Sequence, residues 1–115
     1  SIVDTSSLIG YFSTDKEALI QLISVYLADT EPRLDTLKEN EDILNYETVR
    51  TISHFLKSSL GLMGVSCLNE ISELEKKAID KAPEDTLKKE LIFINTSLQE
   101  SITEYKRILN ALEAL

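Results

Sequence analysis

The composition of this chain limits both its fold and its partners. Its 115 residues are enough for one domain with a single core, and a hydrophobic share of 43% excludes disorder by composition. The formal net charge of -8 argues against a nucleic-acid partner, because binding the phosphate backbone needs a cationic surface. Only three glycines and two prolines occur, so helices are favoured over strands.

The composition also argues against a disulfide-stabilised or membrane-spanning chain. The single cysteine, Cys67, cannot form an internal disulfide, and we expect it to be a small core residue. No apolar run approaches the ~18 residues that cross a bilayer, and no signal peptide is visible. We therefore expect a cytoplasmic segment without direct membrane contact. Because the chain opens at Ser1, we also expect a domain, residues 1–115, cut from a longer protein.

The first elements in chain order are a short helix and a long one. The segment Asp4–Phe12 predicts a short helix that covers one end of a bundle. The candidates for its N-cap are Asp4, Thr5 and Ser6. Ser13 or Thr14 is then expected to cap a second helix. The apolar stripe of this helix runs from Leu19 to Leu37.

Pro32 interrupts the second helix pattern, because proline lacks the backbone donor that would bind Ala28. Two interpretations remain: one kinked helix that reaches about Lys38, or a new helix that starts at Thr30. The apolar stripe stays in phase across Pro32, which favours the kinked helix.

Two further helices follow an acidic loop. Asn45 is expected to cap the third, which should end near Met63 or Gly64 because glycine is a common C-terminal stop. Ser66 is expected to cap the fourth. Its predicted apolar stripe is Leu68, Ile71, Leu74 and Ala78. Its predicted solvated side is Glu70, Glu73, Glu75 and Lys76.

The last helix has the longest regular pattern in the chain. A turn at residues 80–83 should place Pro83 near its first position. Its apolar residues alternate at spacings of four and three, as in one wall of a bundle core: Leu87, Leu91, Ile94, Leu98, Ile102, Tyr105, Leu109 and Leu112. The whole pattern predicts an all-α fold, an antiparallel up-down-up-down four-helix bundle with an additional short N-terminal helix.

The only histidine, His54, is predicted to lie opposite the core face of the third helix. At about 100° per residue, that core face is Val49, Ile52, Leu56 and Met63. The residues one or two turns from His54 are Arg50, Lys57, Ser58 and Gly61. An exposed imidazole with small neighbours is a nucleophile that a second protein can approach. The alternative is an ordinary solvated histidine, with the glycines explained by tight packing or by the end of the helix.

The stretch from His54 to Val65 resembles the phosphoacceptor motif of histidine-containing phosphotransfer (HPt) domains. In that family a lysine lies three positions after the histidine, and small residues follow the lysine. Glycine is frequent ten positions after the histidine. The matching positions are Lys57, Ser58, Ser59, Gly61 and Gly64. The family usually has glycine where this chain has Ser58. The segment Tyr26–Leu34 resembles the helix that precedes the motif in these domains.

The resemblance implies a four-helix bundle that carries phosphoryl groups. His54 would exchange a phosphoryl group with the phospho-aspartate of a receiver domain, and Lys57 would compensate its charge. The receiver-binding face would comprise Arg50, Thr51, Phe55, Ser58, Gly61 and Leu62. Magnesium is expected only on the receiver, so no cofactor or metal is expected on this chain, which should be monomeric by itself.

Other functions are weighed against this one. No nucleotide-binding loop or magnesium-binding carboxylate cluster is visible, so no ATP-dependent kinase activity is expected. The expected setting is the terminal module of a hybrid sensor kinase. One alternative is a non-catalytic helical-bundle interaction module with an incidental histidine. Another is the dimerisation-and-phosphoacceptor domain of a histidine kinase. It is disfavoured because that family usually has an acid directly after the histidine and a proline shortly beyond, whereas Phe55 and Leu56 follow His54 here.

Overall fold

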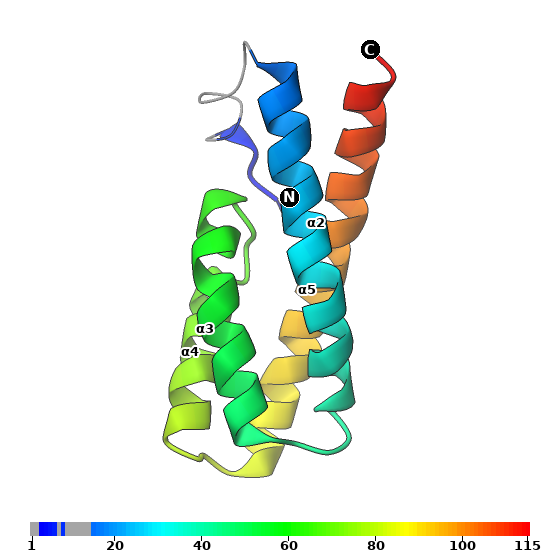
Figure 1. The fold of residues 1–115 in the computed structure, drawn as a ribbon. Helices are drawn as coiled ribbons and strands as arrows, with labels where there is room; N and C mark the ends of the chain where they lie inside the picture. Colours follow the sequence, from blue (N-terminus) through cyan, green and yellow to red (C-terminus); the bar gives the residue numbers. More distant parts are fainter. Residues whose placement is uncertain (1–2, 7, 9–14) are drawn as a thin grey trace.

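The computed structural model describes residues 3–6, 8 and 15–115, and four helices account for most of them (Figure 1). In chain order these are α2 (Lys16–Glu39), α3 (Tyr46–Leu62), α4 (Leu68–Ile79) and α5 (Glu84–Glu113). Over the described ranges, β-type pairing is limited to one isolated bridge between Val3 and Val65. The prediction of an all-helical chain is therefore confirmed.

The helices associate as two pairs. α2 lies along α5 and α3 lies along α4, while the contacts between the pairs are less extensive (Figure 1). α2 and α5 have 24 and 30 residues, whereas α3 and α4 have 17 and 12. The longer pair therefore extends past the shorter one, and the molecule measures 48 × 22 × 21 Å.

The start of α2 corrects one prediction. Asp15 is its N-cap residue, and the carboxylate of Asp15 accepts a hydrogen bond from the backbone N–H of Ala18 at 2.9 Å. The cap is therefore neither Ser13 nor Thr14, because the helix begins one residue after Asp15 and uses the carboxylate there. Ser13 and Thr14 lie outside the described residues, as does most of the predicted short helix Asp4–Phe12.

α2 continues without a break through Pro32 to Glu39. No new helix starts at Thr30, so the interpretation as a single helix holds. The packing side of α2 explains this continuity, because Thr30, Leu34 and Leu37 are all buried on one stripe across the proline. Tertiary packing of the stripe outweighs the one backbone hydrogen bond that proline removes.

The helix that carries His54 ends in a Schellman motif at Gly64. The N–H of Val65 donates to the carbonyl of Leu60 at 3.0 Å, and the N–H of Gly64 donates to that of Gly61 at 3.3 Å. Gly64 has a φ of 64°, the left-handed conformation that favours glycine. A Cβ at Gly64 would also lie 1.9 Å from the carbonyl oxygen of Asp4, whose N–H donates to Gly64. The predicted end of this helix is confirmed.

The start of α4 differs from the prediction. Cys67, not Ser66, is the N-cap residue, and no side chain caps this end. The first intrahelical hydrogen bond of α4 is the regular one, in which the N–H of Ile71 donates to the carbonyl of Cys67 at 2.9 Å. Pro83 is the N-cap residue of α5 and directly precedes its first helical residue, Glu84.

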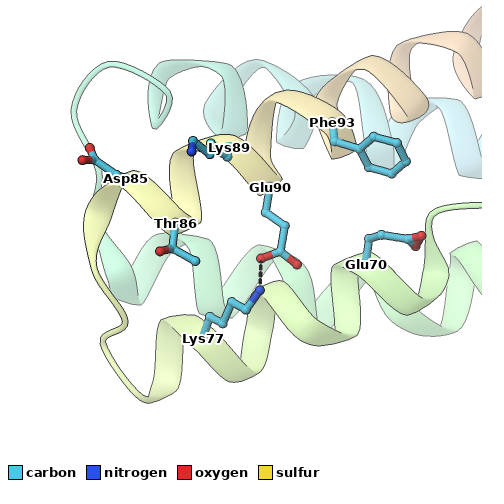
Figure 2. A pocket seen from close by; sticks show the side chains of 7 residues that line it. All are labelled: Glu70, Lys77, Asp85, Thr86, Lys89, Glu90 and Phe93. Atoms are coloured by element: carbon cyan, nitrogen blue, oxygen red, sulfur yellow. Dashed lines mark hydrogen bonds and ion pairs between the residues drawn. The ribbon is translucent and has the colours of Figure 1, made fainter.

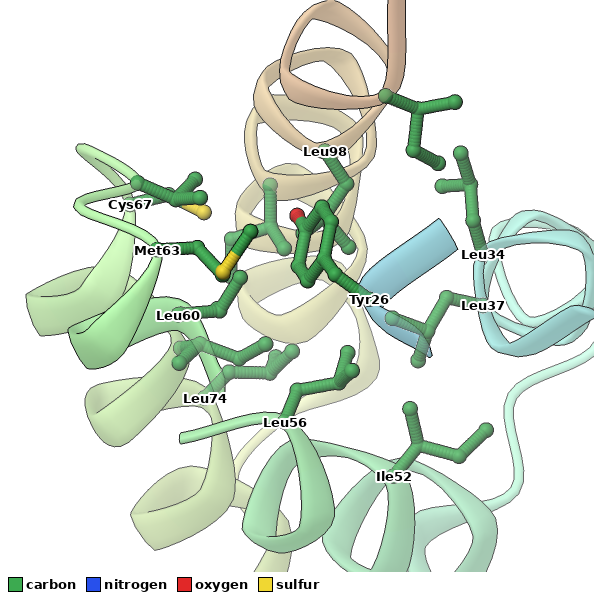
Figure 3. Packing of buried hydrophobic residues seen from close by; sticks show 14 of the residues in the cluster. Tyr26, Leu34, Leu37, Ile52, Leu56, Leu60, Met63, Cys67, Leu74 and Leu98 are labelled. Atoms are coloured by element: carbon green, nitrogen blue, oxygen red, sulfur yellow. The ribbon is translucent and has the colours of Figure 1, made fainter. Parts of the chain in front are cut away.

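The core forms where the helices face one another, and aliphatic side chains from α3 and α4 meet those of α2 and α5 there (Figure 3). Tyr26 and Tyr105 contact each other edge to face with ring centroids 5.4 Å apart. The hydroxyl of Tyr105 donates to the carbonyl of Met63, which fastens α5 to the end of the histidine helix. Among the described residues, none of the helices combines the length and the apolar character that a bilayer span requires.

Candidate functional site

His54 lies on the solvent-facing side of α3, as its position in the helical pattern predicts. Its side chain is 71% exposed. The buried residues of α3 are Val49, Ile52, Ser53, Leu56 and Leu60. All of them except Ser53 belong to the hydrophobic core, on the opposite side of the helix. The structure therefore presents the only imidazole of the chain to solvent from a helix held firmly in the bundle.

A carboxylate from the neighbouring helix holds this imidazole. Nδ1 of His54 lies 2.7 Å from Oε2 of Glu75 on α4. A carboxylate only accepts hydrogen bonds, so the neutral ring carries its proton on Nδ1. Nε2 then bears the free lone pair, and it has no hydrogen-bond partner among the described residues. The contact therefore selects one tautomer and one ring orientation, with the nucleophilic nitrogen accessible.

The second oxygen of the same carboxylate binds Lys57. Nζ of Lys57 lies 2.7 Å from Oε1 of Glu75, whose side chain is only 11% exposed. The Lys57 ammonium lowers the pKa of Glu75, burial raises it by less, and the hydrogen bond from His54 lowers it again. Glu75 is therefore ionised at neutral pH. The three side chains form one cluster, with a buried anion between an exposed imidazole and a half-exposed ammonium.

Glu75 is the functional residue that the sequence analysis missed. Its assignment to the solvated side of the fourth helix is wrong, because Glu75 is buried against α3. The helical pattern held a signal for this. Glu75 is four residues after Ile71 and three before Ala78, so it falls within the apolar arc of α4. An acidic residue inside an apolar arc indicates a paired charge on a neighbouring helix.

The remaining predicted residues spread over both flanks of His54. The guanidinium of Arg50 forms an ion pair with Glu47 one turn earlier. Thr51 and Ser58 are exposed and leave the imidazole unobstructed by bulky groups. Phe55 and Leu62 are 41% and 43% exposed, so neither belongs to the core. These two apolar side chains lie on the side of His54 away from Lys57, by their positions in the helix.

Gly61 has no packing reason to be glycine. A Cβ added there would meet only Cδ2 of Leu68, at an ordinary contact distance of 3.7 Å. Its φ is not in the left-handed region, because Gly64 is the glycine with that conformation. Tight packing against α4 therefore does not account for Gly61. Access to the surface beside His54 remains as an explanation.

A groove between α4 and α5 is a separate feature. Its volume is about 520 Å³, and it is lined by Glu70, Lys77, Asp85, Thr86, Lys89, Glu90 and Phe93 (Figure 2). Lys77 and Glu90 form an ion pair of 2.6 Å across it. No residue of α3 lines this groove, so it does not belong to the His54 site. Among the described residues, no three His, Cys, Asp or Glu side chains are grouped as a metal site requires.

Comparisons of this chain with protein-family models, with curated proteins and with solved structures found no match in any of the three. The functional assignment therefore depends on the geometry around His54. That geometry provides an accessible imidazole nucleophile, a buried carboxylate that fixes its tautomer, and a cation one helical turn away. Such a group can accept an electrophile at Nε2 without first losing a proton.

Proposed function

We propose that this chain is a histidine phosphocarrier in a multistep two-component phosphorelay. His54 exchanges a phosphoryl group with the phospho-aspartate of receiver domains. The observation that carries the proposal is the contact of Glu75 with Nδ1 of His54 at 2.7 Å, on a ring that is 71% exposed. A solvated histidine without a function has no need of a buried carboxylate that fixes its tautomer, because burying a charge is costly.

The proposed step is a direct transfer between two proteins. The lone pair of Nε2 attacks phosphorus, the N–P bond forms, and the acyl-phosphate P–O bond breaks. The aspartate leaves as a carboxylate with the electron pair of that bond. The proton on Nδ1 stays in place, and the positive charge that develops on the imidazole ring is stabilised by Glu75, 2.7 Å away. Both linkages are high in energy, so the transfer can run in either direction.

Lys57 supplies the compensating cation in this proposal. An ammonium has three donors, so Lys57 can keep its bond to Oε1 of Glu75 and donate another to a phosphoryl oxygen on His54. In the unphosphorylated protein the ammonium balances Glu75. The receiver brings its own magnesium and carboxylates, and this chain needs no cofactor of its own.

We also infer an antiparallel up-down-up-down order for the four helices. The connections between them span residues 40–45, 63–67 and 80–83, and connections this short favour antiparallel neighbours. In this setting the chain is a cytoplasmic, monomeric HPt-type module, with the additional short N-terminal helix at one end of the bundle. Its expected place is in a hybrid sensor kinase, beside the receiver that it serves.

The proposal is tested by trapping phosphate on His54. Isolated receiver domains are phosphorylated with acetyl phosphate, freed of it, and mixed with the chain. We expect an acid-labile, base-stable phosphate on the parent and none on His54→Gln. The exposed position of His54 makes the substitution compatible with the fold, which circular dichroism checks. Phosphate on the His54→Gln variant at the parental yield would remove His54 as the acceptor.

A further inference from the structure

Arg33 of α2 covers one face of Phe55, the residue next to His54 in α3. Its guanidinium carbon lies 3.6 Å from the centre of the Phe55 ring, a cation–π contact between the two helices. Nη1 of Arg33 also donates to the carbonyl of Asp29 at 2.8 Å, one turn earlier in α2. Two contacts therefore hold the guanidinium over Phe55, a residue that is still 41% exposed.

Arg33 differs from the other two arginines of the chain. Arg50 and Arg107 each form an ion pair with a glutamate three residues earlier, Glu47 and Glu104. No carboxylate among the described residues lies within ion-pair distance of Arg33. Its contact with Asp29 uses the backbone carbonyl and not the side chain. Arg33 thus keeps its full charge and most of its donors, in a chain whose net charge is -8.

The position of this cation matches the chemistry of the proposed phosphodonor. A phospho-aspartate site that holds magnesium is surrounded by carboxylates, so the rim of the partner's site is acidic. An acidic rim is repelled by the overall charge of this chain and attracted by a local unpaired cation. Phe55 and Leu62 supply exposed apolar area on the same side of His54. Arg33 adds to this apolar surface the positive charge that an acidic partner requires.

We propose that Arg33, held by Phe55, is a specificity-determining residue that docks a carboxylate at the acidic rim of the receiver's active site. This inference rests on the proposed function, because the partner is the phosphodonor of His54. Arg33 acts on the encounter with the receiver and not on the chemical step. Loss of the Arg33 side chain should therefore raise the half-saturating receiver concentration and leave the maximal transfer rate unchanged.

The test compares two arginines that differ in pairing. Arg33→Gln and Arg107→Gln change the net charge by the same amount, and Arg107 is an exposed arginine on α5. Transfer from receiver domains phosphorylated with acetyl phosphate is measured against receiver concentration. We expect Arg33→Gln to raise the half-saturating concentration about fivefold, with a weaker dependence on salt. Arg33→Lys should give a half-saturating concentration between those of the parent and Arg33→Gln, because lysine keeps the charge without the planar guanidinium. Arg107→Gln should match the parent.

A second arm separates docking from nucleophilic competence. Potassium phosphoramidate phosphorylates histidine without a protein partner, so all these variants should react with it at the parental rate. Receiver-dependent transfer to Arg33→Gln with the parental half-saturating concentration would overturn the docking role and leave the phosphocarrier intact. A parent that reacts with phosphoramidate but with none of a panel of phosphorylated receivers would overturn the phosphocarrier proposal and the docking role with it.

Discussion

Glu75 binds the imidazole of His54 across the interface of α3 and α4, with Oε2 of Glu75 2.7 Å from Nδ1 of His54. The two residues are 21 positions apart in the sequence, so the contact exists only when the two helices are packed. The orientation of the nucleophile is therefore a property of the bundle and not of α3 alone. Changes at Glu75 should alter the chemistry of His54 before they alter the fold.

Glu75→Ala should slow receiver-dependent phosphorylation of His54 by about tenfold or more, because the ring loses its fixed orientation. Glu75→Gln should lose less, since its amide oxygen still accepts from Nδ1. Nitrogen-15 shifts of the imidazole measure the tautomer directly. The parent should show the Nδ1-protonated form, and Glu75→Ala should shift toward the Nε2-protonated form. An unchanged tautomer in Glu75→Ala would contradict the role assigned to this carboxylate.

Lys57→Ala should affect both stability and transfer. It removes the ammonium from a buried carboxylate, so the free energy of unfolding should fall by about 1 kcal/mol, more than a fully solvated cation would cost. Transfer should slow, or phospho-His54 should decay faster. Lys57→Arg should retain more stability and more transfer activity than Lys57→Ala, because it keeps the positive charge. Urea denaturation and phosphohistidine lifetimes measure the two effects, and a parental lifetime in Lys57→Ala would exclude Lys57 from the phosphoryl site.

The two glycines after His54 should respond in opposite ways to alanine. Gly61→Ala adds a methyl at an ordinary contact distance and should raise stability by up to about 1 kcal/mol. Gly64→Ala places Cβ against the carbonyl of Asp4 with a positive φ, and should lower stability by at least about 1 kcal/mol. Urea denaturation compares them. Gly61→Trp, which fills the surface beside His54, should instead block transfer while the protein stays folded.

Lowering the pH should reduce the free energy of unfolding, in part through protonation of Glu75. Its pKa is lowered in the folded protein, so the unfolded state takes up the proton first as pH falls. This stabilisation is complete above the ordinary glutamate pKa of about 4.3 and is lost as pH falls through the lower folded value. Between about pH 5 and pH 2, the parent should therefore lose more unfolding free energy than Glu75→Gln, in paired urea titrations. Equal losses would mean that the folded-state pKa of Glu75 is not lowered.

The parts of the site that lie on one helix were predictable from the sequence. Helical periodicity places His54 opposite Leu56 and Val49, and the structure shows that arrangement. The end of α3 was also predictable, because Gly64 supplies the left-handed residue that a Schellman motif uses. These features depend on residues within one or two helical turns of each other.

The parts that join two helices were not predictable in the same way. Glu75 and Arg33 reach His54 and Phe55 from α4 and α2, and periodicity does not define how neighbouring helices are aligned along their axes. The capping error at the start of α2 has a local cause. Adjacent residues such as Thr14 and Asp15 are both good N-caps, so composition alone does not choose between them.

The burial of Cys67 makes site-specific labelling of this protein straightforward. Its thiol is shielded in the core, and burial together with the nearby Glu70 carboxylate raises the pKa of Cys67 to about 12. Thiol reagents need the thiolate, so the native cysteine should stay unmodified while the protein is folded. A cysteine introduced at Ser58 would then be the one reactive group, and a spin label or fluorophore attached there would report directly on what approaches the histidine.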